Sequence, residues 1–143
     1  MAQFSRSSTN NITYKIIAAA IDVHRHLGPG LLESIYQCCM EQELAQRPLS
    51  FHARRHLPVV YKGSKVGHGF EVDLWVEELV LVELKSVQEL APVHEAQLLT
   101  YLKLTGAPIG LLINFNVATL RNGVRRMLNK DHELIDRFRL SSR

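Results

Sequence analysis

Hydrophobic residues recur at intervals of three and four near the start of the chain, which is the spacing of one face of a helix. This spacing predicts a helix over residues 12–27 with an inward stripe of Ile16, Ala20, Val23 and Leu27. Asn10 or Asn11 is suited to cap its start. The Gly-Pro-Gly sequence at 28–30 ends it, because glycine tolerates a left-handed conformation and proline cannot continue a helix.

A second helix fits residues 31–46, and Pro48 lies shortly beyond its end. Its predicted inward stripe consists of Leu32, Ile35, Cys39 and Leu44. Because only the short Gly-Pro-Gly corner separates the two helices, we expect them to pack as a helical hairpin.

From residue 51 the pattern changes to alternation, the period of a half-buried strand. Strands are predicted at 51–61, 65–76 and 79–84, with tight turns at Gly63-Ser64 and Glu77-Glu78. The segment Gly67-His68-Gly69 is expected to permit a bend or a close approach between strands.

The last third of the chain predicts one more helix and one more strand. The helix begins at Pro92 and reaches about Leu104, with Gly106 as its stop signal. Residues 109–113 are continuously apolar, as in a strand covered on both faces. From about residue 116 the chain is mostly polar or helical in pattern. The order ααβββαβ plus a C-terminal tail predicts an α/β fold in a single domain over residues 1–143.

Composition agrees with a globular domain. The chain has 143 residues, of which 46% are hydrophobic and 22% are charged. No apolar run approaches the ~18 residues that cross a membrane, and the polar N-terminus lacks the apolar segment of a secretory signal. The only two cysteines, Cys38 and Cys39, are adjacent and poorly placed for a disulfide. A reduced, cytoplasmic location without a membrane partner is therefore expected.

The net charge of +3 is concentrated near the C-terminus. Residues 117–143 carry seven Lys and Arg against three Asp and Glu, whereas residues 1–116 sum to −1. Such a segment steers polyanions such as nucleic acid toward a protein, but it is also found on ordinary solvated helices. The sequence leaves both interpretations open.

Three charged residues interrupt the apolar strands between residues 70 and 85. Glu83 and Lys85 lie two apart on one strand, so they leave the same face of the sheet. In the predicted hairpin Asp73 lies opposite about residue 82, close to Glu83. These groups need an ion pair, a bound cation or water, because burying them without partners is costly.

Carboxylate oxygens are hard ligands that suit Mg²⁺ or Mn²⁺, and they suit zinc poorly without His or Cys. An ion held by Asp73 and Glu83 can bind a phosphate oxygen and acidify a water molecule, while Lys85 positions that water or offsets negative charge. The competing interpretation is an exposed Glu83–Lys85 pair on a strand surface.

Three further polar residues fall on the predicted helices. Gln97 and Tyr101 lie four apart and share one helix face. Glu33 lies three residues after Gly30 and three before Tyr36. Each also has a structural interpretation, as a polar helix edge with a packed ring or as compensation of the helix dipole.

The order and spacing of these segments resemble a known family. Residues 30–36 (GLLESIY) match the signature of the GxxExxY proteins, followed by the segments 57–63 (LPVVYKG), 82–86 (VELKS), 96–103 (AQLLTYLK) and 110–115 (GLLINF). The resemblance covers about residues 12–127. That family is similar to the PD-(D/E)xK phosphodiesterase superfamily, which implies a restriction-endonuclease-like core with a central mixed sheet flanked by helices.

The resemblance also implies a role for each residue on the two central strands. Asp73 and Glu83 take the places of the metal-binding acids, and the backbone carbonyl of Leu84 that of a further metal ligand. Lys85 takes the place of the catalytic lysine. Val72 stands where the superfamily motif has its proline.

On the helices, Glu33 matches an acidic residue that many members carry before the sheet, where it assists in metal binding. Gln97 and Tyr101 match the QxxxY motif of the RecB-type branch, which places the substrate backbone. The implied function is a Mg²⁺- or Mn²⁺-dependent nuclease, with DNA favoured as substrate. The alternatives are a catalytically silent nucleic-acid-binding module on the same fold, or a regulatory homo-oligomer that associates through an apolar strand such as 109–113.

Overall fold

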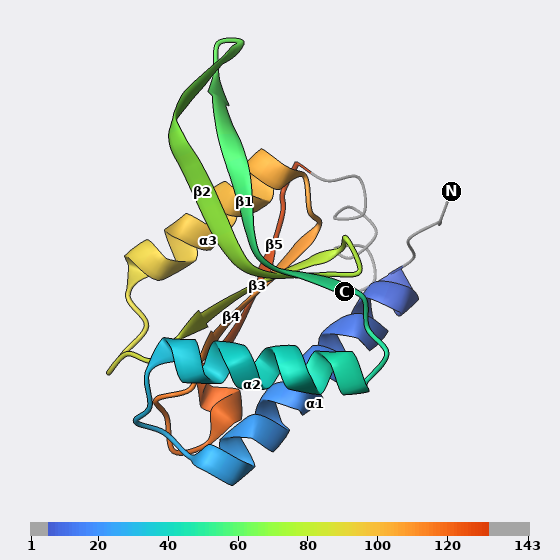
Figure 1. Cartoon of the computed structure of the whole chain (residues 1–143), viewed down its shortest axis with the longest axis vertical. Helices are drawn as coiled ribbons and strands as arrows, with labels where there is room; N and C mark the ends of the chain where they lie inside the picture. The colour runs from blue at the N-terminus through green and yellow to red at the C-terminus, as the bar shows by residue number, and fades with distance from the viewer. Residues whose placement is uncertain (1–5, 132–143) are drawn as a thin grey trace.

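In the computed structural model, which describes residues 6–131, helices lie on both sides of a mixed sheet (Figure 1). The helices are α1 (Arg6–Leu27), α2 (Glu33–Gln46), α3 (Pro92–Thr105) and the short 3₁₀ helix η1 (Leu120–Gly123). The strands are β1 (Phe51–Tyr61), β2 (Ser64–Val76), β3 (Val80–Lys85), β4 (Ile109–Asn114) and β5 (Val124–Leu128). The predicted α/β class, with a sheet flanked by helices, is confirmed.

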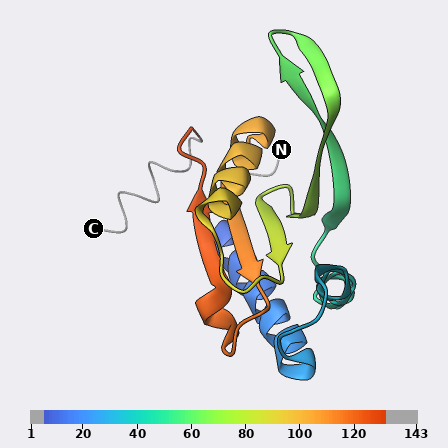
Figure 2. The same ribbon diagram turned by 90° about the vertical axis from the view of Figure 1, so that its left-hand side faces the viewer.

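The strand order is β1-β2-β3-β4-β5, with β3 and β4 parallel and the other neighbours antiparallel. Both central strands are buried almost throughout, as expected for strands covered on two faces. Helices α1 and α2 share one apolar core with the sheet, and α3 shares a second core on the other face (Figure 2). Residues 109–113 lie inside the sheet, so this strand has no free edge through which copies of the chain could pair.

Helix α1 begins at Arg6, several residues before the predicted start, so the predicted cap at Asn10 or Asn11 is wrong. Thr9 and Thr13 are buried and continue the inward stripe of α1 toward its N-terminus. A pattern search that counts only hydrophobic residues misses this extension, because threonine is polar.

The inward face of α2 differs from the predicted stripe. Leu32 precedes the helix and is 73% exposed, and Ile35 is 44% exposed. The side chains of α2 that are buried belong to Tyr36, Gln37, Met40 and Leu44. Both cysteines of the chain are free. The prediction is confirmed at Leu44, which is buried, and at Cys39, which packs partly buried against the core, and it is wrong at the two exposed aliphatic residues.

Tyr36 closes the corner between α1 and α2. Its ring is fully buried and stacks on Phe115, with ring centroids 4.3 Å apart. Its hydroxyl donates to the Gly28 carbonyl at 2.6 Å and accepts from the Leu31 N–H at 3.2 Å. The tyrosine of the segment 30–36 therefore holds the predicted helical hairpin together.

Replacing Tyr36 by Phe is expected to lower the free energy of unfolding by about 1–2 kcal/mol, because two backbone groups at the corner lose their partner. Replacing it by Ala is expected to cost about 3–5 kcal/mol, because the buried ring is lost as well. Urea denaturation measures both. Tyr14→Phe is the matched control, since Tyr14 is 71% exposed; equal effects of the two Phe variants would contradict the role of the Tyr36 hydroxyl.

The turns follow the prediction closely. The β1–β2 turn lies at Lys62-Gly63, one residue before the predicted position, and both residues have positive φ (48° and 84°). The β2–β3 turn includes the predicted Glu77 and Glu78, with φ of 53° and 54°, but it is one residue longer than predicted because Leu79 belongs to it as well. Left-handed residues at both central positions give a turn whose twist matches that of the flanking strands.

Strand β5 was missed by the sequence pattern. It pairs with β4 alone at the sheet edge, and Arg125 and Arg126 are exposed on it, so it carries little hydrophobic alternation. The predicted basic segment continues beyond it, and its part from residue 132 onward lies outside the described residues. Across residues 6–131, no helix combines the length and apolar character that a membrane crossing requires.

Strands β1 and β2 run on past the rest of the sheet as a long hairpin (Figures 1 and 2). The pairing register shifts between Leu57 and Val59. Gly69 has a φ of 78°, and a Cβ atom there would overlap the Leu57 carbonyl oxygen. The close approach predicted at residues 67–69 is therefore confirmed, and it bends the hairpin where it leaves the body of the protein.

Candidate functional site

The two acidic residues of the central strands lie side by side. Leu74 pairs with Val82, so Asp73 stands opposite Glu83 rather than residue 82. The Asp73 N–H donates to Glu83 Oε1 at 3.2 Å, and the Leu84 N–H donates to Asp73 Oδ2 at 2.8 Å. Each carboxyl group thus receives a main-chain hydrogen bond from the opposite strand, which fixes both at one point.

The surroundings of this acidic pair (Asp73 and Glu83) disfavour two negative charges. Burial, followed by the charge of Asp73, raises the pKa of Glu83 to about 8. Burial also raises the pKa of Asp73, against the opposing effect of the hydrogen bond from Leu84. Lys85 acts on both groups in the lowering direction. One ammonium does not compensate two partly dehydrated carboxylates, so the pair favours a further cation.

Helix α3 brings Tyr101 within electrostatic reach of the acidic pair. Burial raises the pKa of Tyr101, and the charges of Glu83 and Asp73 raise it further. Its ring stacks on Phe70 of β2, with centroids 4.6 Å apart. Gln97 is exposed one turn earlier on α3, and over residues 6–131 its side chain makes no hydrogen bond to the pair. The structure therefore brings Tyr101 to the site but gives Gln97 no contact there.

Glu33, the first residue of α2, reaches the end of β3. Its Oε1 accepts a hydrogen bond from the Ser86 N–H at 3.3 Å, and Ser86 Oγ donates to the Leu31 carbonyl at 2.5 Å. The charge of Glu33 adds to burial in raising the pKa of Asp73. The segment 30–36 and the segment 82–86 are thus joined at the site.

A cavity of about 170 Å³ opens next to Asp73. It is lined by Glu33, Ser34, Gln37, Arg54, Asp73 and Leu84. Arg54 has a φ of 51°, a left-handed conformation that residues other than glycine rarely adopt. The β1–β2 ladder pairs residues 53 and 55 of β1 but skips Arg54, so it opens beside Asp73. Backbone strain of this kind gathers at functional sites.

The side chain of Gln37 binds the Asp73 carbonyl beside this opening in the ladder. It is 4% exposed, and its Nε2 donates to the Asp73 carbonyl at 2.8 Å and to Glu41 Oε2 at 3.2 Å. The carbonyl of Asp73 is therefore bound by an α2 side chain, and its N–H is bound by Glu83. Gln37 acts as a positioning residue for Asp73.

The direction of the Leu84 carbonyl follows from the hydrogen bond of the Leu84 N–H. The Leu84 N–H points toward Asp73, and the N–H and C=O of one residue in an extended strand point the same way. Leu84 also lines the cavity beside Asp73. Its carbonyl oxygen is therefore directed toward the acidic pair.

Asn114, at the end of β4, holds the backbone that follows Lys85. Its side chain accepts from the Val87 N–H at 3.0 Å and donates to the Val87 carbonyl at 2.9 Å. The Phe115 N–H donates to the Lys85 carbonyl at 2.9 Å. Sequence reasoning missed Asn114 and Gln37, because both act on backbone groups far along the chain. Their only sequence signal is a polar side chain within a buried pattern.

The residues present fit a small divalent cation. Over residues 6–131 no three His, Cys, Asp or Glu side chains gather into a metal-binding cluster. The candidate donors are instead the carboxylates of Asp73 and Glu83 and the Leu84 carbonyl, all of them oxygen. Mg²⁺ commonly binds through one or two carboxylates and keeps several water molecules, and Mn²⁺ accepts the same ligands. Zinc lacks its preferred nitrogen and sulfur donors here.

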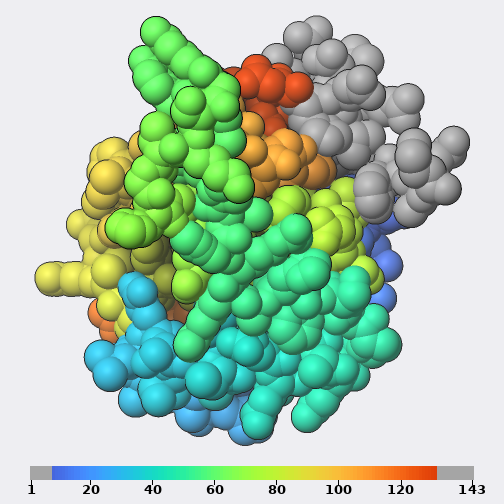
Figure 3. Space-filling view, turned by 45° about the horizontal axis from the view of Figure 1, so that its top comes forward, coloured from blue at the N-terminus to red at the C-terminus, as the bar shows by residue number. Residues whose placement is uncertain are grey.

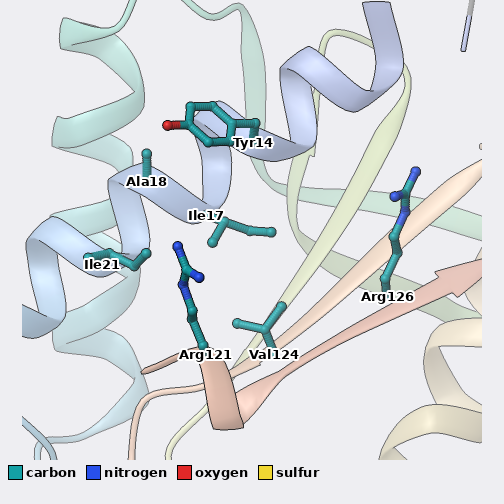
Figure 4. A pocket seen from close by; sticks show the side chains of 7 residues that line it. All are labelled: Tyr14, Ile17, Ala18, Ile21, Arg121, Val124 and Arg126. Atoms are coloured by element: carbon teal, nitrogen blue, oxygen red, sulfur yellow. The ribbon is translucent and has the colours of Figure 1, made fainter. Parts of the chain in front are cut away.

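A larger hollow, of about 390 Å³, lies between α1 and the edge of the sheet (Figure 4). It is lined by Tyr14, Ile17, Ala18, Ile21, Arg121, Val124 and Arg126. Arg121 extends across it toward α1. The hollow contains no carboxylate, and none of the elements around it contributes to the acidic pair, so it is not part of this site.

The fold and the site define a class of protein: helices on both sides of a mixed sheet, with an acid on one strand and a Glu-Leu-Lys sequence at the end of its neighbour. Residues 10–127 match a family model of the PD-(D/E)XK nuclease superfamily. The chain belongs to this superfamily. Neither the curated proteins nor the solved structures gave a match.

Proposed function

We propose that the protein is a metal-dependent nuclease of the GxxExxY type that hydrolyses phosphodiester bonds in DNA. The observation that carries this proposal is the acidic pair, in which the buried carboxyl group of Glu83 and the half-buried one of Asp73 lie together with Lys85 beside them. Such a pair is poorly compensated by one ammonium and is completed by a divalent cation. Membership of a nuclease superfamily supports nucleic acid as the substrate.

In this proposal Asp73, Glu83 and the Leu84 carbonyl hold Mg²⁺ or Mn²⁺, with Glu33 assisting directly or through water. The bound ion would polarise a phosphate oxygen and lower the pKa of a water molecule. Lys85 positions the attacking water and offsets the negative charge that develops on the phosphate.

The remaining residues bind the substrate backbone. Tyr101 and Gln97, which share one face of α3, orient the phosphate and the adjoining sugar. Arg54 lines the cavity next to Asp73 and supplies a guanidinium that can donate two parallel hydrogen bonds to a phosphate.

Titration of the protein with Mn²⁺ tests the metal site. We expect heat of binding in the wild type and its loss in Glu83→Gln, because the amide keeps the shape of the side chain but not its charge. Glu78→Gln is the matched control: it makes the same chemical change at the exposed turn of the same hairpin. Equal binding by wild type and Glu83→Gln contradicts the proposed site.

Cleavage of DNA in the presence of Mg²⁺ or Mn²⁺ then separates the proposed function from its alternative, a catalytically silent binding module. Binding to DNA that survives removal of the metal, without any turnover, favours the module. The single domain, the cytoplasmic location and homo-oligomerisation stay predictions from the sequence.

A further inference from the structure

The part of the β1–β2 hairpin beyond the site has an unusual composition. Residues 54–70, here called the hairpin arm, contain four Lys and Arg and no Asp or Glu, whereas the whole chain has 17 and 14 of these types. The formal charge of the arm alone exceeds the net charge of +3 on the whole chain. A local excess of one sign attracts a polyanion.

The arm projects away from the body of the protein (Figures 1 and 3). All residues from 60 to 69 are exposed. From Arg54 to Tyr61 the strand advances seven residues, roughly 23 Å, which is about seven base-pair steps of duplex DNA. A two-stranded ribbon fits the major groove of B-form DNA, whereas the deep, narrow major groove of A-form RNA excludes it.

The tip of the arm combines lysines with exposed apolar side chains. Val60, Tyr61 and Val66 are 55%, 61% and 42% exposed. Lys62 lies over the Tyr61 ring, 5.4 Å from its centroid. Charges alone would keep an edge strand from pairing with another sheet, but that role does not call for exposed apolar groups beside them. Apolar side chains at a base edge contact thymine methyl groups in the major groove.

The root of the arm adjoins the acidic site. Arg54 lines the cavity that contains Asp73, and Lys62 and Lys65 lie at the opposite end of the arm. Arg55 is engaged otherwise, because it pairs with Glu78 and lies over the Trp75 ring. Arg54 and the two lysines therefore mark the beginning and the end of a basic path that starts at the site.

We propose that the hairpin arm is a DNA-binding ribbon that enters the major groove of a duplex and holds the duplex against the acidic site. This inference rests on the proposed function in that the bound duplex is also the substrate. Lys62 and Lys65 contact phosphates at the groove edges, and the tip between them lies in the groove.

The test measures the affinity of the full chain for a 25-base-pair DNA duplex in EDTA. Fluorescence anisotropy gives this affinity at each of several salt concentrations. Lys62→Gln/Lys65→Gln is expected to bind on the order of tenfold more weakly. Its slope of log affinity against log salt concentration is expected to fall by about 1.8, because two phosphate contacts are lost. The matched control, Lys15→Gln/Arg25→Gln, removes two exposed charges from α1 and is expected to bind as the wild type does.

Three outcomes overturn the proposal. The first is an unchanged salt slope in the arm variant, and the second is an equal loss of DNA affinity in both double variants. The third is a loss of affinity in the arm variant that is equal for duplex DNA, duplex RNA and single strands. Thermal denaturation checks that both variants stay folded. If the wild type cleaves DNA and the arm variant binds and cleaves it equally well, the DNA-binding role of the arm is rejected and the proposed nuclease activity stands. Arm-dependent duplex binding without any cleavage supports the ribbon and rejects the nuclease.

Discussion

Lys85→Met is expected to lower the single-turnover rate of DNA cleavage by on the order of 100-fold or more, because the ammonium acts on charge that develops only during the reaction. Met keeps most of the volume and apolar stem of the half-buried lysine, so the fold should survive the change. Binding of Mn²⁺ is expected to persist, since both carboxylates and the Leu84 carbonyl remain. The variant therefore separates catalysis from metal binding.

The control for this variant is Lys103→Met, which makes the same change at an exposed position of α3. We expect it to cleave at the wild-type rate. Cleavage by Lys85→Met at a rate close to that of the wild type would contradict the proposed role of Lys85. Loss of Mn²⁺ binding in the same variant would instead assign Lys85 to the assembly of the site.

The metal-free protein is expected to lose stability between about pH 5 and pH 8 on account of the acidic pair. The pKa of Glu83 is raised from 4.5 to about 8 on folding. Below pH 4.5 both the folded and the unfolded chain hold the proton, so there is no penalty. As the pH rises toward 8, the unfolded chain releases the proton and the folded chain retains it, which favours unfolding by at most roughly 1.4 kcal/mol per pH unit.

Glu83→Gln removes this dependence, because an amide does not titrate. We expect the variant to match the wild type near pH 5 and to exceed it by on the order of a few kcal/mol near pH 8, measured by urea denaturation in EDTA. Comparing the two proteins cancels the titrating groups that do not interact with Glu83. Saturating Mn²⁺ should restore the wild type at pH 8. A pH-independent difference between the two proteins contradicts the account of the pair.

The contacts that the sequence predicted are those formed between neighbours along the chain. Asp73 and Glu83 are ten residues apart and are joined through the tight turn at residues 77–79, so the predicted hairpin brings them together. The prediction of the residue opposite Asp73 was off by one, because the turn contains three residues rather than the predicted two, and turn length sets the pairing register.

The errors have physical causes that a single sequence does not contain. Leu32 and Ile35 look like core residues, but the rotation of α2 is set by Tyr36 and its stack on Phe115, 79 positions along the chain. The opening of the ladder at Arg54 depends on a left-handed backbone angle and on Gln37, neither of which has a periodic signal. Residues that act through distant backbone groups escape pattern analysis.

The short connection between β2 and β3 also bears on the order in which the protein folds. Closing a three-residue turn costs little chain entropy, whereas the parallel pairing of β3 with β4 requires the long crossover through α3. The two carboxyl groups are thus assembled on the part of the sheet with the lowest contact order, while water still reaches them. We expect them to lose their water only when the helices dock, which places the electrostatic penalty on the late steps of folding.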